Sequence, residues 1–332
     1  MQSANTASAS SSDYEDLLSL WSDLESALAM LLAHPTQVKD FNVKVQQFDR
    51  WMQSLVAQDS DTALYLMFQL ASLSTAGYSG AHALVCAVLC HIAAGELSLE
   101  QDERDSLVAA AMTMNIAMTA LQDELAIQNE RPNPMQQQAI QSHALRGRQL
   151  LEQLGVQSEM WLQVVALHDL TPSEKIPLRH MPESERLGYV LNSIDRYAAM
   201  ISPRKSRPGR SIADSIRTVA GQDELQDEVG QALVRAVGRC PPGTFVRLNT
   251  GETAIVLRRS DRADHPLVAS LATAQGAVLG RPHLYQTAGN GPHIEAALSH
   301  AAVRFDLNPR TMAKLGMFAA HGHSGSAVGN KT

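Results

Sequence analysis

Apolar residues recur along most of this chain at the three-to-four residue spacing that gathers them on one face of a helix. The clearest example is residues 107–123, LVAAAMTMNIAMTALQD. Its apolar face is formed by Leu107, Ala111, Met114, Met118 and Leu121. The spacing therefore predicts one buried helix near the centre of the chain.

The same spacing predicts helices on both sides of this stretch. In an N-terminal helical region, residues 13–75, they cover residues 13–34, 38–57 and 61–72. In the next region, residues 76–240, they cover residues 81–96, 99–120, 135–154, 159–170, 183–200, 211–219 and 225–238. We read residues 174–182 as a loop. These elements favour a mainly α fold built as a helical bundle.

The pattern changes at Pro241. Residues 244–248 and 253–259 are β-prone and are joined by Asn249-Thr250-Gly251, which predicts a hairpin. Residues 267–271 suggest a third strand, and two helical pieces are expected near residues 294–302 and 309–317. We therefore predict a small β-containing C-terminal subdomain over residues 241–318. The polar stretches at residues 1–12 and 319–332 are expected to be disordered.

Composition narrows the classes of function. A hydrophobic share of 45% with 18% charged residues is ordinary for a soluble globular protein. The net charge of −7 argues against a nucleic-acid polymer as partner, since such binders are usually basic. The apolar run at residues 83–94 is too short to span a bilayer, and the N-terminus does not resemble a signal peptide. We expect a cytoplasmic protein with no membrane partner.

The cysteines do not suggest a disulfide framework. Cys86 and Cys90 lie four residues apart in an apolar helical run, and we interpret them as small core residues. Together with Cys240 they fit a reduced, cytoplasmic setting.

Candidate metal ligands follow one another along the predicted helices. They are His82, His143, His168, Asp169 and Asp195. Each histidine alone is more often a core residue than a ligand. However, one ligand from each of several successive helices is how an all-α bundle builds a metal site in its core.

This order of residues resembles the HD-GYP branch of the HD-domain phosphohydrolases, over roughly residues 78–270. The motifs that carry the resemblance are YSGAHAL around His82, SHALRGRQLL around His143, SIDRYAAMISPR around Asp195, and the hairpin PPGTFVRLNTGETAIVLRR. The resemblance implies an HD-domain-like helical bundle. It also implies a site with two or three metal ions, usually iron or manganese, that hydrolyses cyclic di-GMP.

The chain departs from the pattern of this family at several ligand positions. The HD pair falls on Met114-Asn115, and the lysine that should follow falls on Met118. The His-His pair is reduced to His168-Asp169, and the glycine-tyrosine-proline loop is replaced by TPSEKIPL. The second carboxylate of the last motif has become Ala198.

These losses remove the group that would bridge two metal ions. Asn115 is neutral, and the Met114 thioether is a poor ligand for iron(II) or manganese(II). Without an anionic bridge, two divalent ions about 3.5–4 Å apart would repel each other. We expect at most one divalent ion (Fe or Mn), held by His82, His143, His168 and either Asp169 or Asp195.

A basic segment next to Asp195 offers a second kind of site. It contains Arg196, Arg204, Lys205, Arg207 and Arg210. In the family, the corresponding stretch lies at the mouth of the site, where arginine suits bidentate contacts to phosphate. The alternative is a solvated basic loop with no ligand.

Three hypotheses for function follow. The first is a degenerate HD-GYP-type protein in bacterial signalling that binds cyclic di-GMP or a signalling protein, with impaired catalysis. The second is a metal-dependent phosphohydrolase with an altered, mononuclear site. The third is a purely structural helical interaction module. A homodimer is compatible with each of them.

Overall fold

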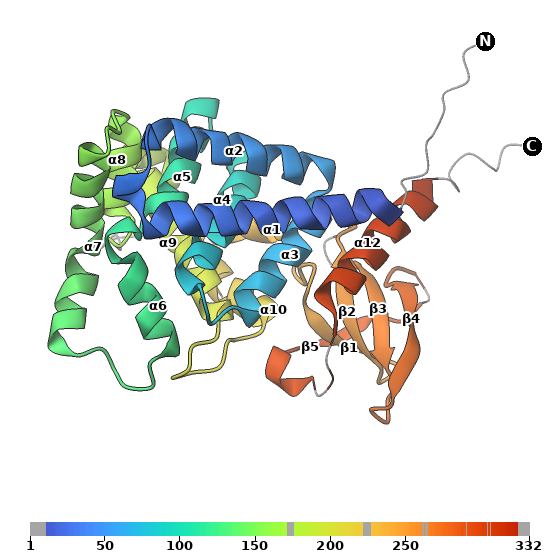
Figure 1. Ribbon diagram of the computed structural model, residues 1–332. Helices are drawn as coiled ribbons and strands as arrows, with labels where there is room; N and C mark the ends of the chain where they lie inside the picture. The colour runs from blue at the N-terminus through green and yellow to red at the C-terminus, as the bar shows by residue number, and fades with distance from the viewer. Residues whose placement is uncertain are drawn as a thin grey trace, which may run out of the picture.

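The protein is mainly helical and ends in a small antiparallel sheet, as the computed structural model shows (Figure 1). The structure describes residues 11–170, 176–221, 227–260, 262, 265–289, 291–303, 305 and 307–324. The N-terminal helices are α1 (Ser11–Ala33), α2 (Phe41–Gln58) and α3 (Ser60–Leu73). The bundle continues with α4 (Tyr78–Glu96), α5 (Gln101–Thr113), α6 (Thr119–Ile127), α7 (Pro134–Gln153), α8 (Glu159–Leu167), α9 (Glu183–Ile201), α10 (Ile212–Ala220) and α11 (Glu228–Val237).

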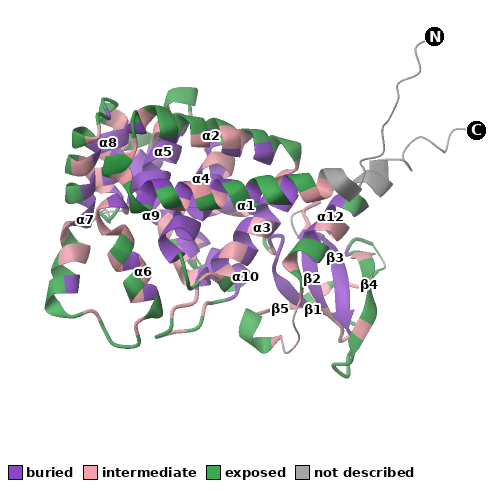
Figure 2. Cartoon of the chain, viewed as in Figure 1, coloured by how far each residue is buried: buried purple, intermediate pink, exposed green. Residues whose placement is uncertain are grey.

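Helix α4 lies at the centre of the bundle. Its sequence is apolar on every side, which is typical of a helix enclosed by others, and it packs against α1, α3, α5, α9 and α11 (Figure 2). It is long and apolar enough to cross a membrane, but 83% of that apolar window is buried inside the protein. Its burial is that of a core helix, and it carries His82 into the interior.

A close approach between α4 and α1 fixes the start of α4. A Cβ atom at Gly80 would lie 2.6 Å from the Ala29 Cβ atom and 3.0 Å from its Cα atom. Only glycine therefore fits there. Because Gly80 lies two residues before His82, this contact sets the position of the candidate ligand.

The predicted helix at residues 107–123 is wrong as a single element. Helix α5 ends at Thr113, a 3-10 turn covers Ile116–Met118, and α6 begins at Thr119. The Met118 N–H donates to the Asn115 carbonyl at 2.9 Å and closes this tighter turn. Asn115 itself has φ −101° and ψ 12°, outside the helical region.

The break redirects α6 toward the start of α4. There the Asp123 carboxylate accepts a 2.7 Å hydrogen bond from the Ser79 N–H, one of the amide groups in the first turn of α4. A straight helix from α5 would carry Asp123 elsewhere. The apolar spacing is the same on both sides of the turn, so periodicity could not reveal it.

The C-terminal part of the chain forms a small antiparallel sheet in the order β4-β3-β2-β1-β5. Its strands are β1 (Phe245–Leu248), β2 (Thr253–Arg258), β3 (Leu267–Ala272), β4 (Val278–Gln286) and β5 (Ile294–Leu298). The predicted β1–β2 hairpin is confirmed, with Gly251 at φ +84° in its turn. The helix expected at residues 294–302 is wrong. Edge pairing with β1 makes β5 a strand, and only His300–Ala302 forms a 3-10 turn.

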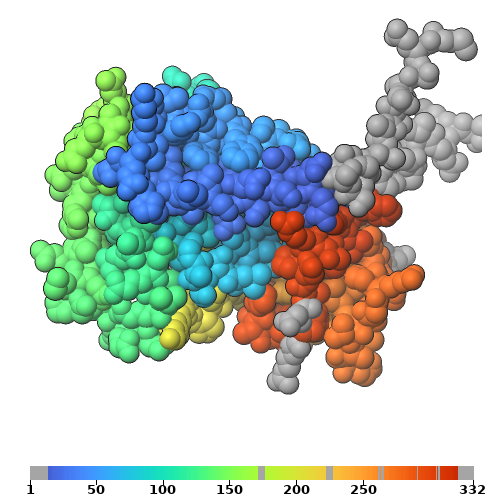
Figure 3. All heavy atoms as spheres, viewed as in Figure 1, coloured from blue at the N-terminus to red at the C-terminus, as the bar shows by residue number. Residues whose placement is uncertain are grey.

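The sheet is held to the N-terminal helices by charged contacts and by α12 (Pro309–Ser324). Arg258 donates to Asp59 at 2.7 Å and Arg259 donates to Asp61 at 2.6 Å. Helix α12 packs on α3 and β2, and α1 lies across the molecule toward α12 (Figure 3). One hydrophobic core therefore runs from α1 through the bundle to α12.

Several helix and loop boundaries differ from those predicted from the sequence. Helix α8 ends at Leu167, before the expected residue 170, and the loop at residues 174–182 contains a 3-10 turn, Leu178–His180. Helix α1 includes residues 11–12, and α12 continues to Ser324, so disorder was wrongly expected at residues 11–12 and 319–324. The remainder of both predicted disordered ends, residues 1–10 and 325–332, lies outside the described residues.

Two glycines of α4 give a matched test of the close approach. Gly80→Ala is expected to lower the free energy of unfolding by about 1–3 kcal/mol, because α1 and α4 must separate. Gly95→Ala is the control, since no atom lies within 4 Å of a Cβ atom there. It should raise stability by about 0.5–1 kcal/mol through helix propensity. Urea unfolding measures both. Equal effects of the two changes would show that the contact is not tight.

Candidate functional site

Helices α4 and α9 bring two of the candidate ligands together. His82 is buried, and its Nε2 atom lies 2.6 Å from Oδ1 of the partly exposed Asp195. Burial raises the pKa of the Asp195 carboxyl, but the hydrogen bond and charge of His82, with the charges of His168 and His143, shift it below its ordinary value. The carboxylate is therefore held ionised beside an imidazole.

Helices α7 and α8 bring the other two histidines together. The Nε2 atoms of His143 and His168, both buried, lie 3.0 Å apart. Each Nδ1 atom faces a backbone carbonyl, that of Ile140 at 2.5 Å for His143 and that of Val165 at 2.7 Å for His168. A carbonyl only accepts, so this network assigns the proton of each ring to Nδ1. When both rings are neutral, both Nε2 lone pairs then point at each other.

The two pairs share one electrostatic environment. Burial lowers the pKa of His168, and the charge of Asp195 opposes this effect, so the two residues lie within interaction range. Asn192, on the same helix as Asp195, donates from Nδ2 to the His168 carbonyl at 2.7 Å. The structure thus assembles His82, His143, His168 and Asp195 around one part of the core. Asp169 is exposed at the end of α8.

The position of the family's HD pair lies at the break after α5. Met114 is buried and, with Asn115, lines a cavity of about 10 Å³ whose other walls include Leu32 and Ala83. A cavity of that size is at the lower limit for a single water molecule. Core side chains therefore fill the space around Met114, and Asn115 is half-buried next to it.

The residues of the basic segment make different kinds of contact. Arg207 donates to the carbonyls of Ala199 at 2.7 Å and Ser202 at 3.4 Å, which satisfies acceptors at the end of α9. Burial lowers the pKa of the Arg207 guanidinium, and the neighbouring charges of Arg204 and Arg210 lower it further. These three arginines form a local positive field.

The two other basic residues proposed for phosphate binding are exposed. Arg196 lies on α9 directly after Asp195. The Lys205 backbone N–H donates to the Ala126 carbonyl at 2.9 Å and ties the basic segment to α6. Neither observation bears on phosphate binding, so the assignment of these two side chains stays a prediction.

Two aromatic contacts connect the basic segment to His82. The Tyr78 ring stacks on the His82 ring with centroids 5.3 Å apart and an interplanar angle of 12°. The Arg204 guanidinium lies over the Tyr78 ring, 5.5 Å from its centroid. Its Nε atom is buried and has no hydrogen-bond partner among the described residues. Arg204 is thus connected to His82 through the Tyr78 ring.

Two residues at this site were not predicted from the sequence. Tyr78 was noted only as part of a motif, and Cys86 was interpreted as a core residue. The Cys86 Sγ atom lies 3.6 Å from the His82 Nε2 atom. The available signal was the spacing of four residues on one helix, which places both side chains on the same face.

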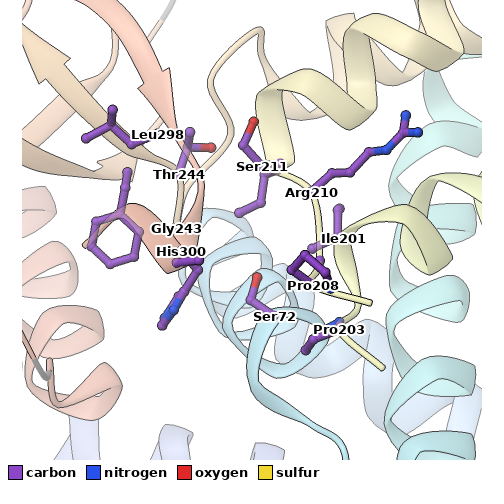
Figure 4. Close-up of a pocket in the computed structure, with 14 residues that line it drawn as sticks. Ser72, Ile201, Pro203, Pro208, Arg210, Ser211, Gly243, Thr244, Leu298 and His300 are labelled. Carbon is purple, nitrogen blue, oxygen red and sulfur yellow. The ribbon is translucent and has the colours of Figure 1, made fainter. Parts of the chain in front are cut away.

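A cavity of about 170 Å³ lies farther along the basic segment, where it meets the sheet (Figure 4). Its walls include Ile201, Phe245 and Leu298, which are apolar. The Arg210 side chain extends away from Thr244 and Leu298 in this view. The cavity is therefore separate from the histidine cluster and is not lined by a group of arginine heads.

Comparison with known proteins identifies no relative of this chain. No family model, no curated protein and no solved structure matches the chain. The resemblance to the HD-GYP branch therefore rests on the quoted motifs and remains an expectation.

The lowered pKa of Asp195 predicts a pH-dependent contribution to stability. Because the folded-state pKa lies below the ordinary value, the ionised carboxylate stabilises the protein above that value, and the contribution is lost as pH falls toward the folded-state pKa. In metal-free protein, Asp195→Asn should cost about 1.5 kcal/mol at pH 7, and the difference from wild type should shrink toward pH 3.

Urea unfolding across this pH range measures the effect. Asp169→Asn is the control, because Asp169 is exposed, and its effect should stay within about 0.5 kcal/mol at each pH. A cost for Asp195→Asn that does not change with pH would show that the carboxylate charge is not the stabilising feature.

Proposed function

We propose that this protein is a degenerate HD-GYP-type signalling protein of the cytoplasm. It holds a single divalent ion and binds cyclic di-GMP, and it has lost most of its capacity to hydrolyse it. One observation carries the proposal. Four candidate ligands gather in the core, whereas the position that would supply the bridging carboxylate is occupied by Met114 and Asn115.

The histidine pair supports binding of one ion. Two nitrogens that each lie about 2.1 Å from the same ion are about 3.0–3.4 Å apart. The Nε2 atoms of His143 and His168 are 3.0 Å apart and carry no proton in the assigned tautomers. Backbone carbonyls that orient the opposite ring nitrogen are a usual support for metal-ligating histidine. A cation between the rings would bind both lone pairs and remove their mutual repulsion.

The surroundings of Met114 argue against a second ion. A binuclear site needs an anionic group that contacts both ions and offsets their repulsion. Asn115 is neutral, and the 10 Å³ cavity beside Met114 leaves no room for an ion with its water ligands. The most common way of activating water for phosphodiester hydrolysis in this site type is therefore missing.

Arg204 supports recognition of a phosphodiester. Its guanidinium is fixed over Tyr78, one ring away from His82, and its Nε atom lacks a partner. A phosphate oxygen would supply that partner in a charge-assisted hydrogen bond. Arg207, by contrast, is engaged with carbonyls at the end of α9.

A second candidate function is a mononuclear metal-dependent phosphohydrolase. Asp195 favours it, because the carboxylate is 29% exposed next to the buried imidazoles and can contact a water molecule on the metal. The two functions differ in product formation, so one set of assays separates them.

The test uses full-length protein loaded with Mn²⁺ and titrated with cyclic di-GMP by calorimetry. Wild type should bind without forming product, and Arg204→Ala should weaken binding at least about tenfold, as expected for loss of a charge-assisted contact. Arg247→Ala is the control, since Arg247 is exposed on β1 and distant in sequence from the basic segment. It should bind as wild type does.

Hydrolysis is followed by chromatography of the nucleotide. The double change Met114→His with Asn115→Asp restores the bridging pair and should raise product formation above wild type. Product formed by wild type and abolished in His143→Ala would overturn the proposal in favour of the phosphohydrolase. Absence of both metal and nucleotide binding would overturn it in favour of a structural module.

A further inference from the structure

A third donor group accompanies the His82–Asp195 pair. His82 and Cys86 lie one helical turn apart on α4 and face α9, which carries Asp195. The His82 Nε2 atom, the Cys86 Sγ atom and an Asp195 carboxylate oxygen all lie within 4.8 Å of one another. An imidazole, a thiol and a carboxylate thus lie close together, although no metal-binding sequence motif predicts this group.

The distances match the edges of a metal coordination polyhedron. A tetrahedral zinc ion with Zn–S of about 2.3 Å and Zn–N of about 2.1 Å separates the sulfur and nitrogen by about 3.6 Å. The Cys86 Sγ and His82 Nε2 atoms are 3.6 Å apart. The His82–Asp195 contact, 2.6 Å, is a hydrogen bond that an ion would replace and widen by less than 1 Å. The partly exposed Asp195 side chain can make that movement.

The charges also balance. Two anionic ligands, a thiolate and a carboxylate, neutralise a divalent ion, and neutral imidazoles complete the shell without adding charge. A neutral set is the one that burial penalises least, because an uncompensated charge in the interior is costly. Cys86 is fully buried, as is His82 but for a few per cent of its surface.

The donor set favours one metal over the others. Thiolate ligands select zinc among the common divalent ions, whereas manganese(II) and iron(II) in hydrolytic sites prefer oxygen and nitrogen. Zinc accepts four ligands and, in catalytic sites, five. The nitrogens of His143 and His168 lie outside the group formed by His82, Cys86 and Asp195, so they complete the shell only if binding draws their rings toward the ion.

We infer that Cys86 is a ligand of the bound ion and that this ion is Zn²⁺, in place of the iron or manganese that the family resemblance implies. The inference rests on the proposed single-ion site. It adds the identity of the ion and a cysteine ligand that the family resemblance does not imply. Binding releases the thiol proton to solvent, and the Nε2 proton of neutral His82 moves to its Nδ1 atom, so that the imidazole stays neutral.

Cobalt(II) gives a direct test, because a thiolate bound to it produces a charge-transfer band in the near ultraviolet. Full-length, metal-free protein is titrated with Co²⁺ and then with Zn²⁺. Wild type should show the band, and Zn²⁺ should abolish it by displacement. Cys86→Ser should lack the band and bind Zn²⁺ at least about a hundredfold more weakly.

Cys90→Ser is the matched control. Cys90 lies one turn farther along α4 and is equally buried, but among the described residues it belongs to no such donor group. This variant should keep both the band and the zinc affinity. A band that persists in Cys86→Ser, or that is lost equally in Cys90→Ser, overturns the inference.

Failure of this inference is distinguishable from failure of the proposed function. Wild type that binds one Mn²⁺ through His143, and Co²⁺ without the band, keeps the single-ion site and overturns only the role of Cys86. If Cys86→Ser does not fold, zinc-edge X-ray absorption of wild type decides. A sulfur shell at about 2.3 Å supports the inference, and a shell of nitrogen and oxygen alone overturns it.

Discussion

A buried histidine near the start of a helix that is apolar on all sides must find its polar partner on a different helix. In this protein that constraint joins α4 to α9 through the His82–Asp195 hydrogen bond. Because α4 is enclosed by α1, α3, α5, α9 and α11, the position of this pair depends on the packing of the whole bundle. The glycine contact at Gly80 adds to it, since it fixes the depth at which α4 meets α1. The site is therefore a consequence of core packing more than of any loop.

The second half of the site follows the same logic on a different pair of helices. His143 and His168 satisfy their Nδ1 atoms within their own helices, each with a carbonyl three residues earlier. This leaves the two Nε2 atoms directed into the core, where only a proton or a cation can lie between them. The break after α5 lies at the position where the bridging carboxylate is missing. The chain turns there, so that the Asp123 carboxylate accepts a hydrogen bond from the first turn of α4. Met114 fills the space beside α4.

Much of the fold could be predicted from the sequence, because helical periodicity and the Asn249-Thr250-Gly251 turn are local signals. The break at residues 114–118 could not, since a 3-10 turn leaves the apolar spacing unchanged. Strand β5 was missed because its residues, IEAAL, have good helix propensity, and only edge pairing with β1 makes them a strand. The order of histidines indicated which residues would meet, whereas their division into two pairs depends on helix packing. Cys86 was hidden because a ligand thiol and a core cysteine look alike on an apolar helix.

We propose that His82, His143, His168 and Asp195 form a site for one ion. Anomalous diffraction from crystals of the metal-loaded protein, collected at the absorption edge of the metal, tests it most directly. We expect one peak within bonding distance of the Nε2 atoms of His143 and His168 and near the Asp195 carboxylate. Two peaks about 3.5–4 Å apart, as in a binuclear hydrolase, or a single peak away from these residues, would contradict it.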